Sequence, residues 1–239
     1  PTMFRAVYTW SDLWERWWRE YNKSGRVIEN FVPVGLPVAE HLSWIDRAEV
    51  RQTFGIPEGR RVVLYLPYPF ESAPSWWGWR YGLPFGGDRA VVRAVRRLCD
   101  RNNALMIVKS RAKNPVRSYT ADAADLVVDR DEPGEPTLLR LLTVSDLMIH
   151  PMSTSVTEAA AAGVPSLCVR TRHLASVYDK RGLPDFYGYE CADPWWHLAN
   201  LSLLTGWLGR YEGYVDTFLG GTPFRAGARI VDDLERRVG

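Results

Sequence analysis

The feature that most constrains the fold of this chain is a series of short, continuous apolar runs that alternate with segments of helical periodicity. Such runs are typical of parallel strands buried on both faces, because a strand with one wet face alternates apolar and polar residues. Strands that alternate with helices favour one parallel sheet covered on both faces. The runs are RVVLYLP, ALMIVKS, ADLVVD, DLMIHP and PSLCVR, at residues 61–67, 104–110, 124–129, 146–151 and 165–170.

The segments between and after these runs carry the helical pattern. We predict an α/β fold: a Rossmann-like parallel sheet with helices on both faces and a helical C-terminal tail. We assign residues 1–35 to the tail end of an N-terminal domain or a linker, and residues 36–239 to the Rossmann-like domain with its C-terminal helices. Helices are expected at 46–60, where Gly55 and Pro57 stop a short helix, and at 88–102, 135–145, 153–163 and 222–238.

The N-terminal segment has its own pattern, which is rich in tryptophan. Trp10, Trp14 and Trp17 recur at helical spacing, while charged residues fall elsewhere on the helix. An aromatic face of this kind is either core or an interface with another domain. The expected elements are a strand at 4–10, a helix at 11–21 and a strand at 26–37 that ends in a Gly-Leu-Pro turn.

Composition and charge exclude several function classes. The 30 Lys and Arg residues against 28 Asp and Glu give a formal charge of +2, which makes no case for a general nucleic-acid binder. Three scattered cysteines without a CxxC pair give neither a disulfide framework nor a zinc site, so a cytoplasmic setting fits best. No apolar run approaches the roughly 20 residues that span a bilayer. The opening PTMFRAVYTW has no initiator Met, so we expect a fragment.

A hydroxyl-rich turn follows the fourth apolar run. Ser153, Thr154 and Ser155 stand at the mouth of a predicted helix, and Glu158 lies about one turn inside it. A helix N-terminus offers backbone N–H groups that favour phosphate, and a carboxylate one turn deeper can accept hydrogen bonds from a ribose. The turn and Glu158 therefore form a candidate nucleotide site. The alternative is that the hydroxyls only cap the helix and that Glu158 is a solvated charge.

Other candidate residues follow two of the predicted strands. Lys109 and Arg111 come at the end of the second run, where they can neutralise a diphosphate, or belong to a solvated basic loop. His150 ends the fourth run, as a contact to phosphate or base and a possible catalytic residue, or as a structural hydrogen-bonding group. The histidines show no metal-ligand spacing with any Cys or Glu, so we expect no metal site.

A long loop at 67–87 separates the first run from the next helix. Loops of this length are often binding elements. Trp76, Trp77 and Trp79 within it can contact an acceptor or a membrane surface through their amphipathic rings, or can fill a gap beneath the loop.

The segment SDLMIHPMSTSVTEAAAAGVPSLCV resembles the C-terminal half of GT-B glycosyltransferases, and more narrowly the capsule and teichoic-acid enzymes related to CDP-glycerol glycerophosphotransferases. In that family an Asp-led apolar strand runs into a Ser-Ser or Ser-Thr turn, a helix with an acidic residue, Gly-x-Pro and a strand. Glu40 stands where the family usually has Asp, and Arg111 stands at the position of a motif histidine. Similar segments in the family's order are NFVPVGLPVAEHL, RQTFGIPEGRRVVLYLPYPF, ALMIVKSRAKNP and FRAGARIVDDLERR, so the likeness covers roughly residues 27–239.

The resemblance implies the donor-binding domain of a bacterial glycosyltransferase or polyol-phosphate transferase. Its donor would be a nucleotide-sugar or CDP-polyol, used for surface polysaccharide or teichoic-acid-like polymer synthesis, with no metal and no cofactor besides the donor. Phosphate would lie near Thr154 and Ser155, Lys109 and Arg111 would offset its charge, and Glu158 would hold the ribose. The acceptor side and any general base would lie in an N-terminal half, so we expect no turnover by this chain alone. The expected location is the cytoplasm, with a peripheral contact at the inner face of the cell membrane.

Two other functions remain open at this point. A UDP-N-acetylglucosamine 2-epimerase-like isomerase would share the fold and a similar Ser…Glu helix. A non-catalytic module would instead bind a membrane or a partner protein through its tryptophans. A Rossmann dehydrogenase is disfavoured, because no GxGxxG motif opens a helix after a predicted strand.

Overall fold

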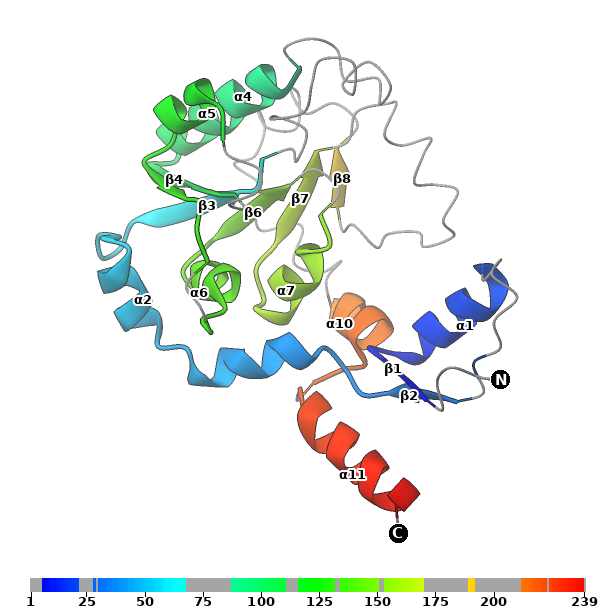
Figure 1. Cartoon of the computed structure of the whole chain (residues 1–239). Helices are drawn as coiled ribbons and strands as arrows, with labels where there is room; N and C mark the ends of the chain where they lie inside the picture. Colours follow the sequence, from blue (N-terminus) through cyan, green and yellow to red (C-terminus); the bar gives the residue numbers. More distant parts are fainter. Residues whose placement is uncertain are drawn as a thin grey trace.

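The protein is described by a computed structural model (Figure 1). The structure describes residues 6–21, 28, 30–67, 87–110, 116–131, 134–150, 153–169, 189–191, 212–222 and 224–238.

A six-stranded, all-parallel sheet forms the centre of the fold, with the strand order β5-β4-β3-β6-β7-β8. The five apolar runs supply the first five strands in chain order, which confirms the predicted fold class. The sixth, β8, was not predicted. The strands are β3 (Arg61–Tyr65), β4 (Ala104–Lys109), β5 (Leu126–Val128), β6 (Leu147–His150), β7 (Ser166–Val169) and β8 (Tyr189–Cys191).

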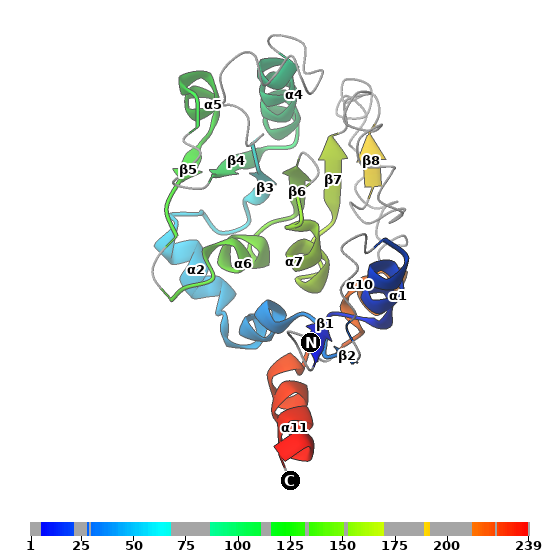
Figure 2. The same ribbon diagram turned by 45° about the vertical axis from the view of Figure 1, so that its right-hand side comes forward.

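Helices cover both faces of this sheet (Figures 1 and 2). Successive side chains of a strand point to opposite faces, so Val63 and Tyr65 pack with α4, whereas Val62 and Leu64 pack with α6 and α7. Full burial of each aliphatic side chain contributes about 1.5–3 kcal/mol. On one face lie α4 (Gly87–Arg101) and α5 (Ser118–Ala123), and on the other lie α2 (Arg47–Thr53), α6 (Thr137–Thr143) and α7 (Val156–Ala161).

Two aspartates join neighbouring strands at the amino edge of the sheet. The Asp146 carboxylate, just before β6, accepts a hydrogen bond from the Val62 N–H of β3 at 2.7 Å. Asp125, just before β5, accepts from the Met106 N–H of β4 at 2.7 Å. Burial would raise the pKa of Asp125, but hydrogen bonds from Arg96 and from Met106 outweigh it and lower the pKa below its usual range. Both carboxylates therefore satisfy strand amides.

The N-terminal segment forms a second, two-stranded parallel sheet from β1 (Val7–Thr9) and β2 (Phe31–Pro33), joined by α1 (Asp12–Tyr21). The tryptophan face of α1 is half-buried against α10 (Glu212–Leu219). Trp14 donates its indole N–H to the Phe218 carbonyl at 2.9 Å, and its ring meets Trp10 edge-on at 5.0 Å. The face thus serves as an interface between the two ends of the chain. The proposed domain division at residue 35 stays a prediction.

A turn at Gly35 and a 3-10 helix connect the two sheets. Gly35 has φ +95°, in the region that favours glycine. The strand predicted to reach residue 37 ends at Pro33, and Pro37 opens the 3-10 helix η1 (Pro37–Trp44). Glu40 in η1 accepts the Gly227 N–H at 2.6 Å and so caps α11 (Ala226–Val238). In both views α11 extends away from the two sheets (Figures 1 and 2).

Candidate functional site

The order of strands reverses between β3 and β6, since the chain builds outward from β3 first in one direction and then in the other. In open parallel sheets, ligands bind beyond the carboxyl ends of the strands at such a reversal. The two strand ends are hydrogen-bonded to each other here: the Leu66 N–H donates to the Ile149 carbonyl at 2.9 Å. His150 is the next residue of β6, so the reversal places it at the edge where a ligand is expected.

His150 is fully buried, with 0% exposure. Its Nδ1 accepts a hydrogen bond from the Ser153 N–H at 3.0 Å, so the neutral ring carries its proton on Nε2. Among the described residues, Nε2 has no hydrogen-bond partner. Burial lowers the pKa of His150 to about 3, because the charged imidazolium would lose its hydration. The site therefore holds a neutral N–H donor that none of the described residues satisfies.

The hydroxyl turn lies directly beside this imidazole. The Ser153 hydroxyl donates to Ser155 Oγ at 3.0 Å and accepts the Ser155 N–H at 3.2 Å. Thr154 is exposed, and Ser155 is buried. The following helix, α7, begins at Val156 and has 6 residues, so the predicted helix at 153–163 is shorter than expected. A helix this short has little macrodipole, and an anion at the turn would depend on local hydroxyl and N–H donors.

Glu158 is partly buried in α7. The Thr157 hydroxyl lies 2.8 Å from Glu158 Oε2 and 2.8 Å from the Thr154 carbonyl, so its single proton serves one acceptor at a time. Glu158 Oε1 has no partner among the described residues. The carboxylate is thus held by its neighbour with one oxygen available as an acceptor.

Lys109 ends β4, the strand beside β3, and is 7% exposed. Its ammonium group donates to the Ser110 carbonyl at 2.5 Å and forms an ion pair with Asp131 at 2.9 Å. The sequence did not indicate this ion pair, because Asp131 lies beyond the next strand, β5. Lys109 therefore stands at the predicted edge of the sheet, where a carboxylate already compensates its charge.

The other predicted site residues, Arg111, Trp76, Trp77 and Trp79, lie outside the described residues. Within the described ranges, no group of three His, Cys, Asp or Glu side chains is arranged to hold a metal ion. None of the helices in that part of the chain combines the length and the apolar character needed to cross a membrane.

No family model and no curated protein matches this chain. Solved structures do. The wall teichoic acid polymerase TagF matches with a TM-score of 0.63 and 14% identity, over 98% of this chain and 58% of that chain. The chain has a GT-B glycosyltransferase-like fold. A UDP-GlcNAc 2-epimerase from Neisseria meningitidis, bound to UDP-GlcNAc, matches with a TM-score of 0.56 and 14% identity, over 86% of this chain and 55% of that one.

The GT-B-like fold confirms the resemblance inferred from the sequence. At this level of identity the likeness concerns the fold alone, and the chain spans a little over half the length of these two proteins. The strand order of the sheet agrees with a ligand crevice at the ends of β3 and β6, where His150, Ser153 and Ser155 meet.

Proposed function

We propose that this chain is the donor-nucleotide-binding half of a GT-B transferase that uses a nucleotide-sugar or CDP-polyol donor to build a surface polysaccharide or teichoic-acid-like polymer. One observation carries the proposal. A buried, neutral imidazole, whose Nε2–H has no partner within the described part of the chain, lies beside a hydroxyl turn at the strand reversal of a GT-B-like sheet. A buried donor without a hydrogen bond costs free energy, because it has lost its contact with water. A hydrogen-bond acceptor on a ligand would remove this cost.

The similar structures support this choice of ligand class. One similar protein is a wall teichoic acid polymerase, and another is bound to UDP-GlcNAc. The proposed reaction takes place in the cytoplasm, and we propose a peripheral contact of Trp76, Trp77 and Trp79 with an acceptor or with the inner face of the membrane.

In the proposed reaction an acceptor hydroxyl oxygen attacks the anomeric carbon or the polyol phosphorus of the donor. The bond from that atom to the nucleotide phosphate breaks, and the leaving nucleotide keeps the electron pair. His150 Nε2–H and the Ser153–Ser155 turn would hydrogen-bond the phosphate as its negative charge grows. Lys109 and Arg111 would offset that charge without a metal ion, and Glu158 would accept hydrogen bonds from the ribose.

The acceptor proton must leave during this attack. We assign its removal to a general base on the acceptor-binding half of the enzyme, so the chain alone is proposed to bind donor without turning it over. Nucleotide binding, rather than product formation, is therefore the first property to test.

The test is a thermal-shift panel of CDP, UDP, GDP and ADP on the wild type, Glu158→Ala and a matched control, Glu58→Ala. Glu58 is exposed and lies in the turn before β3. At about 100 times its dissociation constant, a ligand adds roughly 2.7 kcal/mol to stability. We expect one base to stabilise the wild type and the control and to lose this effect in Glu158→Ala. A response of equal size in all three proteins would remove Glu158 from the site, and no response to any nucleotide would contradict donor binding by this half.

A second candidate function is an epimerase that acts on a UDP-sugar, favoured by the likeness to the UDP-GlcNAc 2-epimerase. It differs from the transferase in needing no acceptor. Epimerised sugar formed from UDP-GlcNAc alone, and lost in His150→Asn, would favour this function over transfer.

A further inference from the structure

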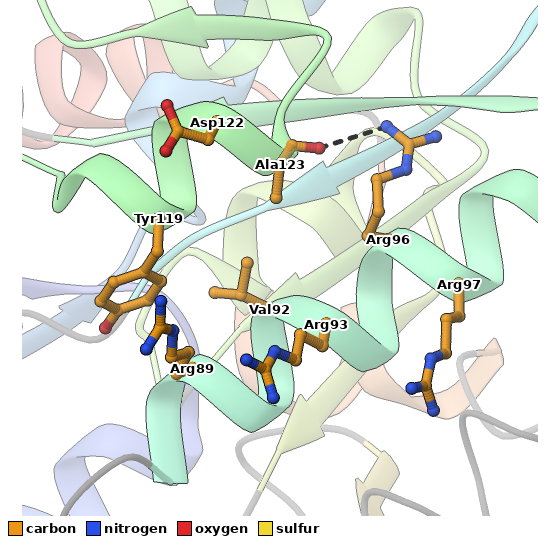
Figure 3. A pocket seen from close by; sticks show the side chains of 8 residues that line it. All are labelled: Arg89, Val92, Arg93, Arg96, Arg97, Tyr119, Asp122 and Ala123. Atoms are coloured by element: carbon orange, nitrogen blue, oxygen red, sulfur yellow. Dashed lines mark hydrogen bonds between the residues drawn. The ribbon is translucent and has the colours of Figure 1, made fainter.

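A groove of about 420 Å³ lies between α4 and α5, on the face of the sheet opposite α7 (Figure 1 and Figure 3). Arginines line its α4 side. Arg89, Arg93 and Arg97 recur every four residues, which places them along one side of the helix over about 12 Å. The formal charge of the whole chain is only +2, so this row is a local concentration of positive charge.

Within the described part of the chain, the charges in this row are largely uncompensated. Arg96, which also lines the groove, is neutralised by ion pairs with Asp100 at 2.8 Å and Asp125 at 2.7 Å. Arg93 and Arg97 are exposed and have no ion-pair partner among the described residues. Arg89 has no carboxylate partner there either, although its guanidinium lies 5.4 Å from the centre of the Tyr119 ring. Three arginines of the groove's lining therefore have no carboxylate partner within the described residues.

The acidic residue among the groove's described lining is Asp122 of α5. It forms no ion pair with the arginine row, and Figure 3 shows it on α5, across from the helix that carries the arginines. The α4 side of the groove thus carries a line of fork-shaped donors, which match phosphate oxygens bidentately.

We infer that this groove binds a linear polymer that carries phosphate groups along its length. A row of charges with a rise of about 6 Å between successive arginines suits a ligand whose charges also recur, better than a single phosphate. Single-stranded nucleic acid would need free aromatic faces on which to stack its bases. The aromatic ring of the groove's described lining, Tyr119, is already approached by Arg89.

The lining also disfavours a membrane as the occupant. Proteins that lie on a bilayer combine basic residues with exposed large apolar side chains. The exposed large hydrophobic residues of the described chain are Trp44, Val231 and Leu234, on η1 and α11, and none of them lines the groove.

The row also has a direction relative to the strand ends. Because β3 and β4 are parallel, α4 must run back between them, so its first turn with Arg89 lies toward the carboxyl edge of the sheet. A polymer along the row would point one end toward the edge that carries His150. A role of this polymer end in the transfer reaction rests on the proposed function, whereas binding of the polymer by the groove does not.

The experiment measures the binding of fluorescently labelled long-chain inorganic polyphosphate to the whole chain by anisotropy. The test variant reverses two charges of the row, R93E/R97E, and the matched control reverses two exposed arginines elsewhere, R47E/R61E, with the same change in net charge. Arg47 lies in α2, on the opposite face of the sheet, and Arg61 begins β3. We expect R93E/R97E to bind roughly 10-fold or more weakly, with a salt dependence shallower by about two phosphate contacts. The control should stay within about two-fold of the wild type.

Three further ligands, namely tripolyphosphate, a single-stranded oligonucleotide and phosphatidylglycerol-rich vesicles, decide which class of molecule the groove binds. Tripolyphosphate should compete much less well per phosphate than the long chain, because it engages only part of the row. Equal loss in both double variants would overturn the inference, because total charge would then explain binding. Tighter binding of a single-stranded oligonucleotide, or of vesicles rich in phosphatidylglycerol, than of polyphosphate would overturn it in favour of those partners.

Folding and donor binding are controlled separately. R93Q/R97Q removes the charges without introducing carboxylates and should also weaken polyphosphate binding, while unfolding curves verify that both variants fold. The nucleotide thermal shift should survive in R93E/R97E. Loss of polyphosphate binding with an intact nucleotide response, or the reverse, separates failure of the groove from failure of the donor site.

Discussion

The two edges of the six-stranded sheet treat their polar groups in opposite ways. At the amino edge, Asp125 and Asp146 each accept a hydrogen bond from an amide of the neighbouring strand. At the carboxyl edge, fully buried His150 keeps an Nε2–H that has no partner within the described residues. The buried N–H groups of Val62 and Met106 are thus satisfied inside the chain by two exposed carboxylates, which serve the fold. The buried His150 N–H is a group that a ligand can complete.

The largest expected effect comes from breaking the amino edge. Asp146→Ala leaves the Val62 N–H without its acceptor inside a strand that is almost wholly buried, and should lower the free energy of unfolding by about 1–3 kcal/mol. Urea denaturation measures this change. The nucleotide response should persist under conditions where the variant is folded, since Asp146 lies at the edge opposite the proposed site.

Asp146→Asn is the matched control, because its amide oxygen can still accept from the Val62 N–H. It should recover most of the loss. If both substitutions destabilise equally, the charge rather than the hydrogen bond of Asp146 holds the two strands together.

The pH dependence of stability tests the carboxyl edge. Below pH 6.5 the unfolded chain protonates His150, while the native imidazole stays neutral down to about pH 3. The free energy of unfolding therefore falls with decreasing pH by about 1.4 kcal/mol per unit through this window. His150→Asn, whose Oδ1 can still accept the Ser153 N–H, lacks this contribution. Between pH 7.5 and 5.5, the wild type should lose about 1.4 kcal/mol more than the variant.

Taking the difference between the two proteins cancels the titration of the carboxylates, which they share. Parallel pH profiles for wild type and His150→Asn would mean that His150 protonates in the native state as readily as in the unfolded state. The imidazole would then not be the neutral donor that the proposed site requires.

A smaller effect is expected within the hydroxyl turn. Ser153→Ala removes the oxygen that accepts the Ser155 N–H and donates to Ser155 Oγ, so it should lower the free energy of unfolding by about 1 kcal/mol. Thr154→Ala, at the exposed neighbour, should stay within about 0.5 kcal/mol of the wild type. Denaturant unfolding compares the two variants directly, and a larger loss in Thr154→Ala would show that the turn is held together in another way.

The parts of the fold that the sequence predicted are those with local signals. Five apolar runs became β3 to β7, and the helices on both faces follow from their periodicity. The strand β8 has the sequence Tyr-Glu-Cys, which is too short and too polar to stand out as a buried strand. The short helix α5, SYTADA, lacks large apolar residues at helical spacing, so its sequence does not predict a helix. Strand order is a non-local property, so the reversal between β3 and β6 needed the structure.

The same division applies to the candidate site. Ser153 and Ser155 were predicted from a turn and His150 from the end of the strand before it, and the structure brings them into one hydrogen-bonded group. The partner of Lys109 was missed, because Asp131 follows a different strand. The basic groove was also missed: α4 shows its arginines in the sequence, but the helix that forms the other wall, α5, was not predicted.

The smallest expected change in stability concerns the ion pair between Lys109 and Asp131. It lies at the same edge of the sheet as His150, but both of its charges have a partner inside the chain. The side chain of Asp131 is 59% exposed, so water screens much of its attraction to Lys109. Asp131→Asn also keeps an amide oxygen that can accept a hydrogen bond from Lys109. The free energy of unfolding should therefore change by about 0.5 kcal/mol or less. Nucleotide binding should become tighter, because the competing negative charge beside Lys109 is removed while the ammonium group stays at the end of β4. Calorimetric titration with the nucleotide that stabilises the wild type measures this affinity. The control is Asp129→Asn, which removes an exposed carboxylate just after β5. Unchanged affinity in Asp131→Asn would class Lys109 with Asp125 and Asp146, as a residue whose charge serves the sheet rather than a ligand.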